Sequence, residues 1–242
     1  MKLLDEYEIK AQRCPALLAL FPLLFGAYAL FPDLRGSWGY LGGVAVALGL
    51  PTGLAFVARH LGKQLEDPLY ERWGGKPTTV MLRWSDSQIV PETKARYHAA
   101  MRKAGLAMPT REEEAENPTK ADETYEAAGD LLRGKTRAKK AFPFVFTHLV
   151  SYGFARNLLG LRWIGLGISM VCAVIEIIII FKTIKAGSEI SGFLVGPAVI
   201  SVGAAIFWIC FVRSNWVRNT AHSYARALFE ACEYLTGKKK DK

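Results

Sequence analysis

Four long apolar segments constrain the fold of this chain more than any other feature of its sequence. A helix needs about 20 apolar residues to cross a hydrocarbon core about 30 Å thick. The apolar segments approach this length, and they cover residues 14–31, 37–58, 163–181 and 190–212. We therefore expect a mainly α-helical integral membrane protein with four transmembrane helices.

The links between these segments predict two helical hairpins around a polar insert. Residues 32–36 join the first pair, residues 182–189 join the second pair, and residues 59–162 separate the pairs. A C-terminal helix is expected to continue the fourth transmembrane helix, because apolar residues recur every three or four positions from Val212 to Leu235. The expected parts are an N-terminal membrane hairpin (1–58), a mostly helical cytoplasmic domain (59–162), a C-terminal membrane hairpin (163–212) and a cytoplasmic C-terminal helix with a basic tail (213–242).

The distribution of Lys and Arg predicts the orientation of the helices. Loops with more Lys and Arg stay on the cytoplasmic side, and residues near the helix ends carry most weight. Of the 31 Lys and Arg residues, 18 lie in residues 59–162 and seven lie after residue 212, whereas the two short links hold three. We therefore expect a multi-pass protein of the bacterial inner (plasma) membrane, with both termini and the insert in the cytoplasm.

Small residues recur at four-residue spacing in the second and fourth apolar segments. The second contains Gly39, Gly43 and Ala47, and the fourth contains Gly192 and Gly196. Such stripes let membrane helices approach closely, because packing drives helix association in lipid. Two interpretations remain open, namely tight packing within each hairpin and contact between copies of the chain in a homo-oligomer.

Gly, Pro and capping residues divide the insert into short helices. The second membrane helix is expected to extend until Pro68 interrupts it, and a Gly-rich turn follows before residues 78–82, which are the best strand candidate. A helix is expected from Pro91 to Lys103, capped by Asp86 or Ser87 and ended by Gly105. A capping box at Thr110–Glu113 and the pair Asn117–Pro118 mark two further helix starts, the second helix running towards Lys140.

Glu176 is the main candidate for a functional residue in the membrane. It is the one ionisable side chain deep inside an apolar segment, where a charge costs at least about 2.5 kcal/mol. The functional interpretations are a pore-lining ring in an oligomer, an ion or proton site, or a partner for a basic residue. The structural interpretation is a protonated carboxyl group that bonds to Ser201 or to a backbone carbonyl.

The Gly-rich turn at residues 73–79 is a candidate ligand or partner loop. It lacks the Gly-x4-Gly-Lys-Ser/Thr spacing of a phosphate-binding loop, and Pro77 is expected to block the helix start that such a loop requires. A purely structural turn is the other interpretation. The candidate residues are Trp73, Gly74, Gly75, Lys76, Thr78 and Thr79.

A basic run precedes an aromatic segment just before the third membrane helix. One interpretation is an interfacial helix on anionic lipid, and the other assigns the aromatic residues 142–146 to the core of the cytoplasmic domain. The basic residues, which are candidates for contact with anionic lipid or a partner, are Arg133, Lys135, Arg137, Lys139 and Lys140.

The sequence lacks the signatures of enzymes, metal sites and cofactor sites. Its four Cys residues are far apart, and no Cys or His pair has the short spacing of a zinc site. No His belongs to a nucleophile motif, so we expect surface or interface positions for all four. The sequence therefore predicts no cofactor, no bound metal and no enzymatic activity.

Two functions from different classes remain. In the first, the protein is an oligomeric channel or membrane-perturbing effector that its cytoplasmic domain controls through a ligand or partner. In the second, it is a membrane-anchored scaffold or sensor that docks a soluble protein or nucleic acid. The expected partners are the lipid bilayer, further copies of the chain and a cytoplasmic protein, and nucleic acid is less favoured because the net charge of +9 equally suits anionic headgroups.

The layout of the chain bears on the choice between these functions. Four membrane helices around a compact cytoplasmic insert resemble the small bacterial membrane effectors of phage-defence systems, and also small channels and scaffolds. The resemblance implies a role in antiviral defence for the first function. It covers the whole chain loosely and assigns no residue a role.

Overall fold

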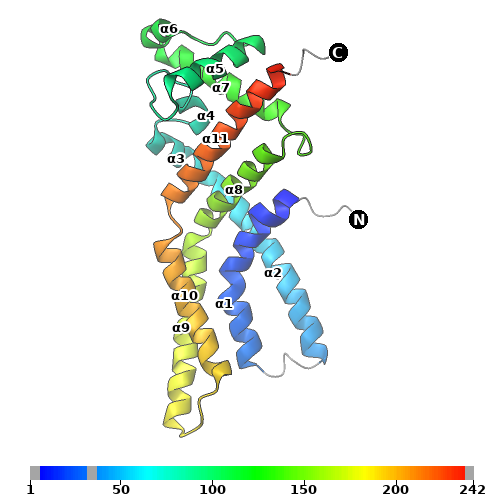
Figure 1. Ribbon diagram of the computed structural model, residues 1–242. Coiled ribbons are helices and arrows are strands. Elements are labelled where there is room, and N and C mark those ends of the chain that lie inside the picture. Colours follow the sequence, from blue (N-terminus) through cyan, green and yellow to red (C-terminus); the bar gives the residue numbers. More distant parts are fainter. Residues whose placement is uncertain (1–5, 32–36, 238–242) are drawn as a thin grey trace. The chain divides into compact units, whose positions relative to one another are not determined.

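Every regular element in the described part of the chain is a helix (Figure 1). The computed structural model describes residues 6–31 and 37–237. The chain divides into two compact units. Unit 1 comprises residues 1–65 and 153–216, and unit 2 comprises residues 66–152 and 217–242.

Unit 1 contains three helices that are long and apolar enough to cross a membrane. They are the continuous stretch Glu8–Leu30, formed by η1 (Glu8–Arg13) and α1 (Cys14–Leu30), then α9 (Arg162–Lys185) and α10 (Gly192–Cys210). Their bounds lie within a few residues of three of the expected segments. This is consistent with a multi-pass membrane protein.

The second expected span lies on α2 (Ser37–Gln64). This helix packs against α1 and η1. Gly39 and Ala47 of its small-residue stripe lie outside the residues whose side chains are described. The four-span arrangement therefore stays a prediction.

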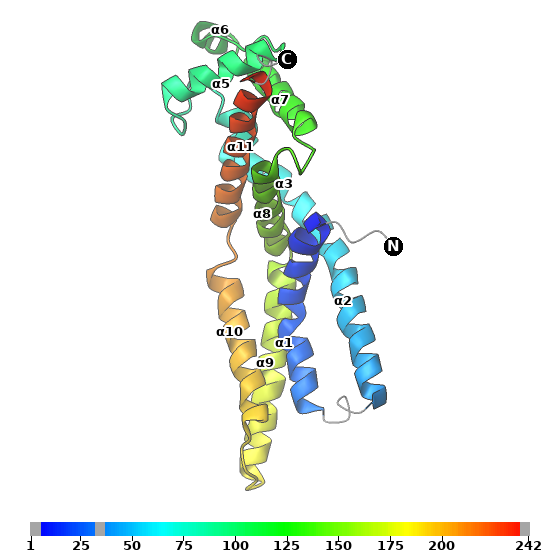
Figure 2. The ribbon, with the colours of Figure 1, turned by 45° about the vertical axis from the view of Figure 1, so that its right-hand side comes forward.

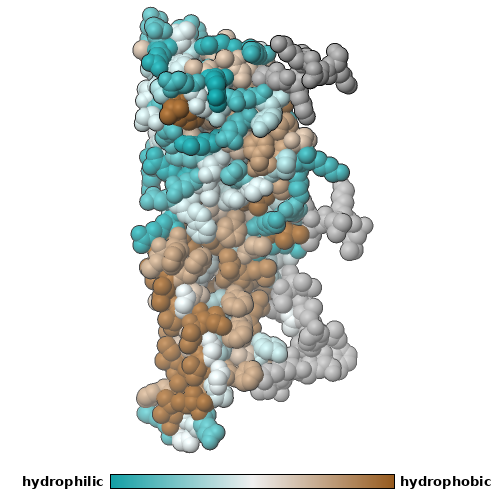
Figure 3. Space-filling view, viewed as in Figure 1, coloured by the Kyte–Doolittle hydropathy of each residue, from teal (hydrophilic) through white to brown (hydrophobic). Residues whose placement is uncertain are grey.

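Helices α9 and α10 run side by side, and α1 packs against both (Figures 1 and 2). The helix surfaces between them carry small side chains, including Ala19, Ala173 and Ala198, which are buried. Large apolar side chains point outward instead, and Figure 3 shows them gathered over α9 and α10. An exposed apolar surface of this extent suits contact with lipid rather than water.

A hydrogen bond from Asn157 compensates for a proline at the start of the first span. In an α-helix the N–H of residue 15 would bond to the carbonyl of Ala11, but Pro15 has no N–H. The buried Asn157 side chain of α8 (Pro143–Gly160) donates to this carbonyl at 2.7 Å instead. One inward-facing amide thus joins the N-terminal helix to α8.

Glycine permits another close helix contact nearby. A Cβ added to Gly160 would lie 2.6 Å from the backbone nitrogen of Gly62 on α2. Nothing larger fits where these two backbones cross, so α2 and α8 are packed backbone to backbone.

Unit 2 is a small helical domain with its own apolar core. Its helices are α3 (Glu66–Trp73), α4 (Pro77–Val80), α5 (Pro91–Lys103), α6 (Arg111–Glu116), α7 (Pro118–Lys135), the first part of α8 and most of α11 (Ser214–Gly237). Met81, Met101 and Tyr125 form the centre of the core, and Leu228 and Phe229 of α11 pack against them. The C-terminal helix therefore packs on the polar domain.

Local sequence signals located several element ends correctly. Helix α5 runs from Pro91 to Lys103 as expected, and Gly105 adopts φ +96° directly after it. The capping box is confirmed, because Thr110 and Glu113 satisfy each other's backbone N–H groups before α6. Asn117 caps α7 through its side chain, which accepts the N–H of Lys120 at 3.0 Å.

Two expectations about proline were wrong. Pro68 does not end a helix, because α2 already ends at Gln64 and Pro68 lies in the first turn of α3. Pro77 does not block a helix start, because it is the first residue of α4, and residues 78–82 contain no strand. The first turn of a helix tolerates proline because its N–H groups lack partners inside the helix.

Three expected boundaries also differ. Neither Asp86 nor Ser87 caps α5, whose N-cap residue is Val90 without a side-chain hydrogen bond. Helix α7 ends at Lys135 rather than near Lys140. Helix α10 ends at Cys210 and α11 begins at Ser214, so the C-terminal helix does not continue the fourth apolar helix without a break.

Contact between Gly165 and Trp208 provides a test of the α9–α10 packing. The fully buried Trp208 ring lies against Gly165, and an added Cβ would overlap it. We expect Gly165→Ala to lower the free energy of unfolding by about 1–3 kcal/mol, because overpacking forces the ring to move. The measurement is the apparent melting temperature of the full-length protein in detergent.

Gly167→Ala is the matched control, because a Cβ at Gly167, two residues along the same helix, meets no atom within 4 Å. It should leave the melting temperature unchanged or raise it slightly, since Ala favours helix over Gly by about 1 kcal/mol. Equal melting temperatures for both variants would contradict the packing described here.

Candidate functional site

Glu176 lies in the interior of the bundle formed by α1, α9 and α10. Its position on α9 is about 21 Å along the helix axis from Arg162, at 1.5 Å per residue, so it lies well inside a helix that is long and apolar enough to cross a membrane. The side chain is only 2% exposed. Its carboxyl group therefore points into the chain's own helices rather than towards the outside of the bundle.

Helices α1 and α10 supply the surroundings of this carboxyl group. A Cβ added to Gly26 of α1 would lie 2.6 Å from Oε1 of Glu176, so the carboxyl oxygen occupies space that only glycine leaves free. The fully buried Ser201 hydroxyl of α10 lies close to the carboxyl group but outside hydrogen-bonding geometry. Oε2 of Glu176 and Oγ of Ser201 therefore keep unused hydrogen-bonding capacity.

No described basic side chain forms an ion pair with Glu176. The interpretation as a partner for a basic residue therefore gains no support. The direct bond to Ser201 in the structural interpretation is not formed in this geometry, although the two groups are neighbours. The site combines one acid and one hydroxyl in apolar surroundings.

The candidate loop at residues 73–79 forms a turn that is tied to α7. Gly74 and Gly75 adopt φ values of +79° and +135°, which favour glycine. Lys76 forms an ion pair with Glu126 of α7. The side chain of Thr78 is buried against Gly129 of the same helix.

Part of this loop lines an open groove of about 420 Å³ on unit 2. Gly75, Lys76 and Thr79 contribute one wall, whereas Trp73, Gly74 and Thr78 do not line it. The other lining residues are Asp67, Tyr70, Glu71, Arg83, Asp122 and Glu126. Both basic side chains in the groove are already paired with carboxylates of α7, so the loop does not present a free anion site.

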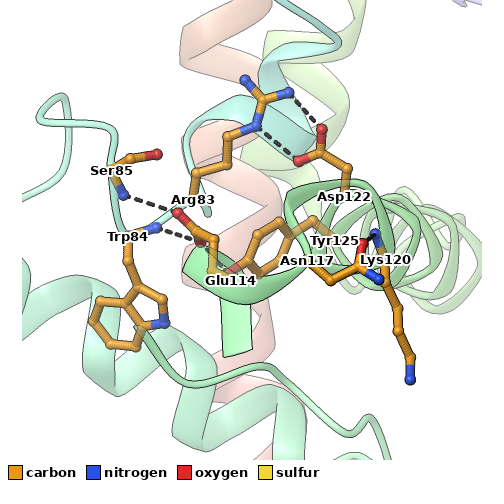
Figure 4. A network of polar contacts seen from close by, with 8 residues as sticks. All are labelled: Arg83, Trp84, Ser85, Glu114, Asn117, Lys120, Asp122 and Tyr125. Atoms are coloured by element: carbon orange, nitrogen blue, oxygen red, sulfur yellow. Dashed lines mark hydrogen bonds and ion pairs between the residues drawn. The ribbon is translucent and has the colours of Figure 1, made fainter. Parts of the chain in front are cut away.

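A polar network beside this groove holds the segment after α4 (Figure 4). Arg83 donates two hydrogen bonds of 2.7 Å to the carboxylate of Asp122. Glu114 accepts the backbone N–H groups of Trp84 at 2.8 Å and Ser85 at 3.1 Å, and the hydroxyl of Tyr125 at 2.6 Å. This network could not be predicted from the sequence, because nothing in the run of Glu residues 112–114 marks which side chain turns inward.

Burial and hydrogen bonding oppose each other at Glu114. Burial alone would raise its pKa, but the hydrogen bonds from Tyr125, Trp84 and Ser85 outweigh it and hold the pKa below the usual value. Burial, together with the bond to Glu114, raises the pKa of Tyr125. Glu114 is therefore a charged acceptor that stabilises a turn.

Two buried polar side chains of α5 hold the same segment from the other side. Lys94, which is 1% exposed, donates to the carbonyls of Arg83 and Asp86, and burial lowers its pKa. His98 bonds through Nε2 to the carbonyl of Leu82 at 2.9 Å. We expected a surface or interface position for His98, and this was wrong. Its ring is fully buried between the rings of Trp84 and Tyr125.

The basic run remains exposed while the aromatic segment after it is packed. Val145 is buried in the core of unit 2, and Phe142 and Phe144 pack against that core. These contacts favour the domain-core interpretation of the aromatic residues over the interfacial helix. The charges are left in solvent, except that Arg133 pairs with Asp130 and Lys139 lies 4.8 Å from the centre of the Phe146 ring.

Comparisons with known proteins assign this chain to no family. No protein-family model, no curated protein and no solved structure matches the chain. Among the described residues, no group of three or more His, Cys, Asp or Glu side chains could hold a metal ion. The site hypotheses therefore rest on the geometry alone.

His98 gives unit 2 a pH-dependent stability. Burial lowers its pKa to about 4 in the folded protein, whereas the unfolded chain takes up the proton near pH 6.5. Between these two values the unfolded state binds more protons, so stability falls as the pH is lowered. We expect unit 2 to lose on the order of 2 kcal/mol between pH 7 and pH 5.

Hydrogen exchange of the amides in residues 91–103 of the full-length protein measures this loss. His98→Asn should flatten the pH dependence after correction for intrinsic exchange, whatever its own effect on stability. His60→Gln, at an exposed position on α2, should leave the dependence unchanged. A wild-type protein whose protection is equal at both pH values would contradict the assignment.

Proposed function

We propose that this protein is an oligomeric channel or membrane-perturbing effector of the bacterial inner membrane, controlled by its cytoplasmic domain through a ligand or partner. The buried, unpaired Glu176 carries the proposal. An anchor needs only apolar side chains, and a carboxyl group at lipid depth costs at least about 2.5 kcal/mol when charged. This cost is explained if the carboxyl group takes part in moving ions or protons through the bundle, or in changing how the helices pack.

Open glycine faces on unit 1 support assembly into an oligomer. A Cβ placed on Gly43 or Gly53 of α2 meets no atom within 4 Å, and the same holds for Gly192, Gly196 and Gly203 of α10. These glycines are not used for close packing inside the chain. Another copy of the chain could use them, because small residues let membrane helices approach closely.

Under the proposal, unit 2 binds the ligand or partner that controls the membrane helices. Its groove beside the 73–79 loop offers a surface for a ligand or partner protein. The chain passes between the two units three times, between α2 and α3, inside α8 and inside α11. Under the proposal both termini and this domain face the cytoplasm, as the distribution of Lys and Arg predicts.

A membrane-anchored scaffold is the second candidate function. It is favoured by the exposed basic run, where Lys135, Arg137 and Lys140 have no carboxylate partner among the described ion pairs. These cations suit an acidic protein, with nucleic acid as the weaker choice. On this alternative Glu176 would serve only the packing of the bundle.

A membrane-potential dye in bacteria that carry an inducible copy distinguishes the two functions. We expect expression of the wild type to depolarise the cells and Glu176→Ala to lose most of this effect at equal membrane abundance. The matched control is Glu189→Gln, which changes an exposed carboxylate in the α9–α10 link. Depolarisation that is equal in wild type and Glu176→Ala would contradict the role given to Glu176.

A further inference from the structure

We infer that Glu176 binds a proton and that the protonated carboxyl group keeps α1 packed against α9 and α10. The inference rests on the proposed function, since it concerns the same carboxyl group, and it names the ligand. That ligand is a proton rather than a metal ion.

Among the described residues, no positively charged side chain pairs with Glu176. The group that faces it from α1 is the backbone at Gly26, and from α10 it is the Ser201 hydroxyl. On α9 itself the nearest titratable group is the thiol of Cys172, one turn earlier. An ionised carboxylate that is 2% exposed would therefore stay uncompensated, which the apolar surroundings penalise strongly.

A metal ion is a poor alternative as the compensating charge. Hard cations such as Ca²⁺ take about six to eight oxygen ligands, whereas the groups here offer the carboxylate and one hydroxyl. The described residues also contain no cluster of three potential metal ligands. A proton needs a single carboxyl oxygen, so the site fits a proton.

The unused hydrogen-bonding capacity of Glu176 and Ser201 also fits a bound proton. Oε2 of Glu176 and Oγ of Ser201 are both buried without a hydrogen-bond partner. A proton on Oε2 creates an O–H donor, and the neighbouring Ser201 oxygen is an available acceptor. The protonated acid and the hydroxyl can therefore satisfy each other after a small side-chain rotation.

The contact at Gly26 couples the proton to helix packing. Because Oε1 occupies the space beside Gly26, separation of α1 from α9 would expose the carboxyl group to water. Ionisation requires such hydration, so the closed bundle binds the proton and a loosened bundle releases it. A rise in pH must then favour the loosened bundle by linkage.

Infrared spectroscopy of the full-length protein in lipid vesicles tests this inference directly. The C=O stretch of a protonated carboxylic acid should be present in the wild type, should disappear as the pH is raised from about 5 to about 10, and should be missing in Glu176→Gln. Ser201→Ala should shift the frequency of this stretch, because it removes the acceptor. Glu189→Gln should leave the stretch unchanged.

The position of α1 provides the second readout. A spin-label pair on α1 and α9 should separate at high pH in the wild type and stay close in Glu176→Gln, which mimics the protonated acid and keeps the helix content measured by circular dichroism. A carboxylic C=O stretch that is absent at every pH, or that never titrates, overturns the inference. So does a stretch that persists in Glu176→Gln.

These outcomes separate the inference from the proposed function. A titrating carboxylic acid in a protein that does not depolarise cells would refute the channel or effector and leave the proton site standing. Depolarisation that depends on Glu176, without any carboxylic C=O stretch, would refute the proton site and leave the proposed function standing.

Discussion

The burial of one carboxyl group among three apolar helices constrains the membrane unit more than any other interaction. Glu176 cannot face lipid without a large cost, and no described basic side chain pairs with it. The Ser201 hydroxyl lies near the carboxyl group on one side. Gly26 makes room for it on the other side, because Oε1 lies where any larger residue would place its Cβ. This contact is the basis for the inferred coupling between the packing of α1 on α9 and α10 and the protonation of Glu176.

Unit 2 uses buried polar groups for a different purpose. Glu114, Lys94 and His98 all bond to the backbone between Leu82 and Asp86. This segment has no regular secondary structure of its own, so its backbone groups need partners from side chains. The three residues consequently define the shape of the surface that carries the groove, and none of them is free to take part in chemistry there.

Much of the helical organisation could be predicted from the sequence, because it follows from local physics. The apolar segments gave the ends of α1 and α9 to within a few residues, and the capping box before α6 and the glycine after α5 were read correctly. These features depend on residues adjacent in the chain. Glu176 was singled out from the sequence because one acid inside an apolar run is conspicuous, and its role stays a prediction.

The remaining features depend on contacts between distant residues, which no local pattern reveals. Nothing near Asn157 shows that its amide would satisfy the carbonyl left free by Pro15, 142 positions away. The inward turn of His98 likewise depends on the rings of Trp84 and Tyr125. The break before α11 was missed because the apolar spacing continues across it. Gly26 was not singled out, since its role appears only when Glu176 lies beside it.

Solid-state NMR on the protein in lipid bilayers can detect the contact between Glu176 and Gly26. The measurement is the ¹³C correlation between the side-chain carboxyl carbon of Glu176 and the Cα of Gly26, with labelled protein diluted into unlabelled protein. We expect a correlation whose intensity per labelled molecule survives dilution, because both residues belong to one chain. An absent correlation would contradict the packing of α1 against Glu176. One that disappears on dilution would instead place Glu176 between copies of the chain.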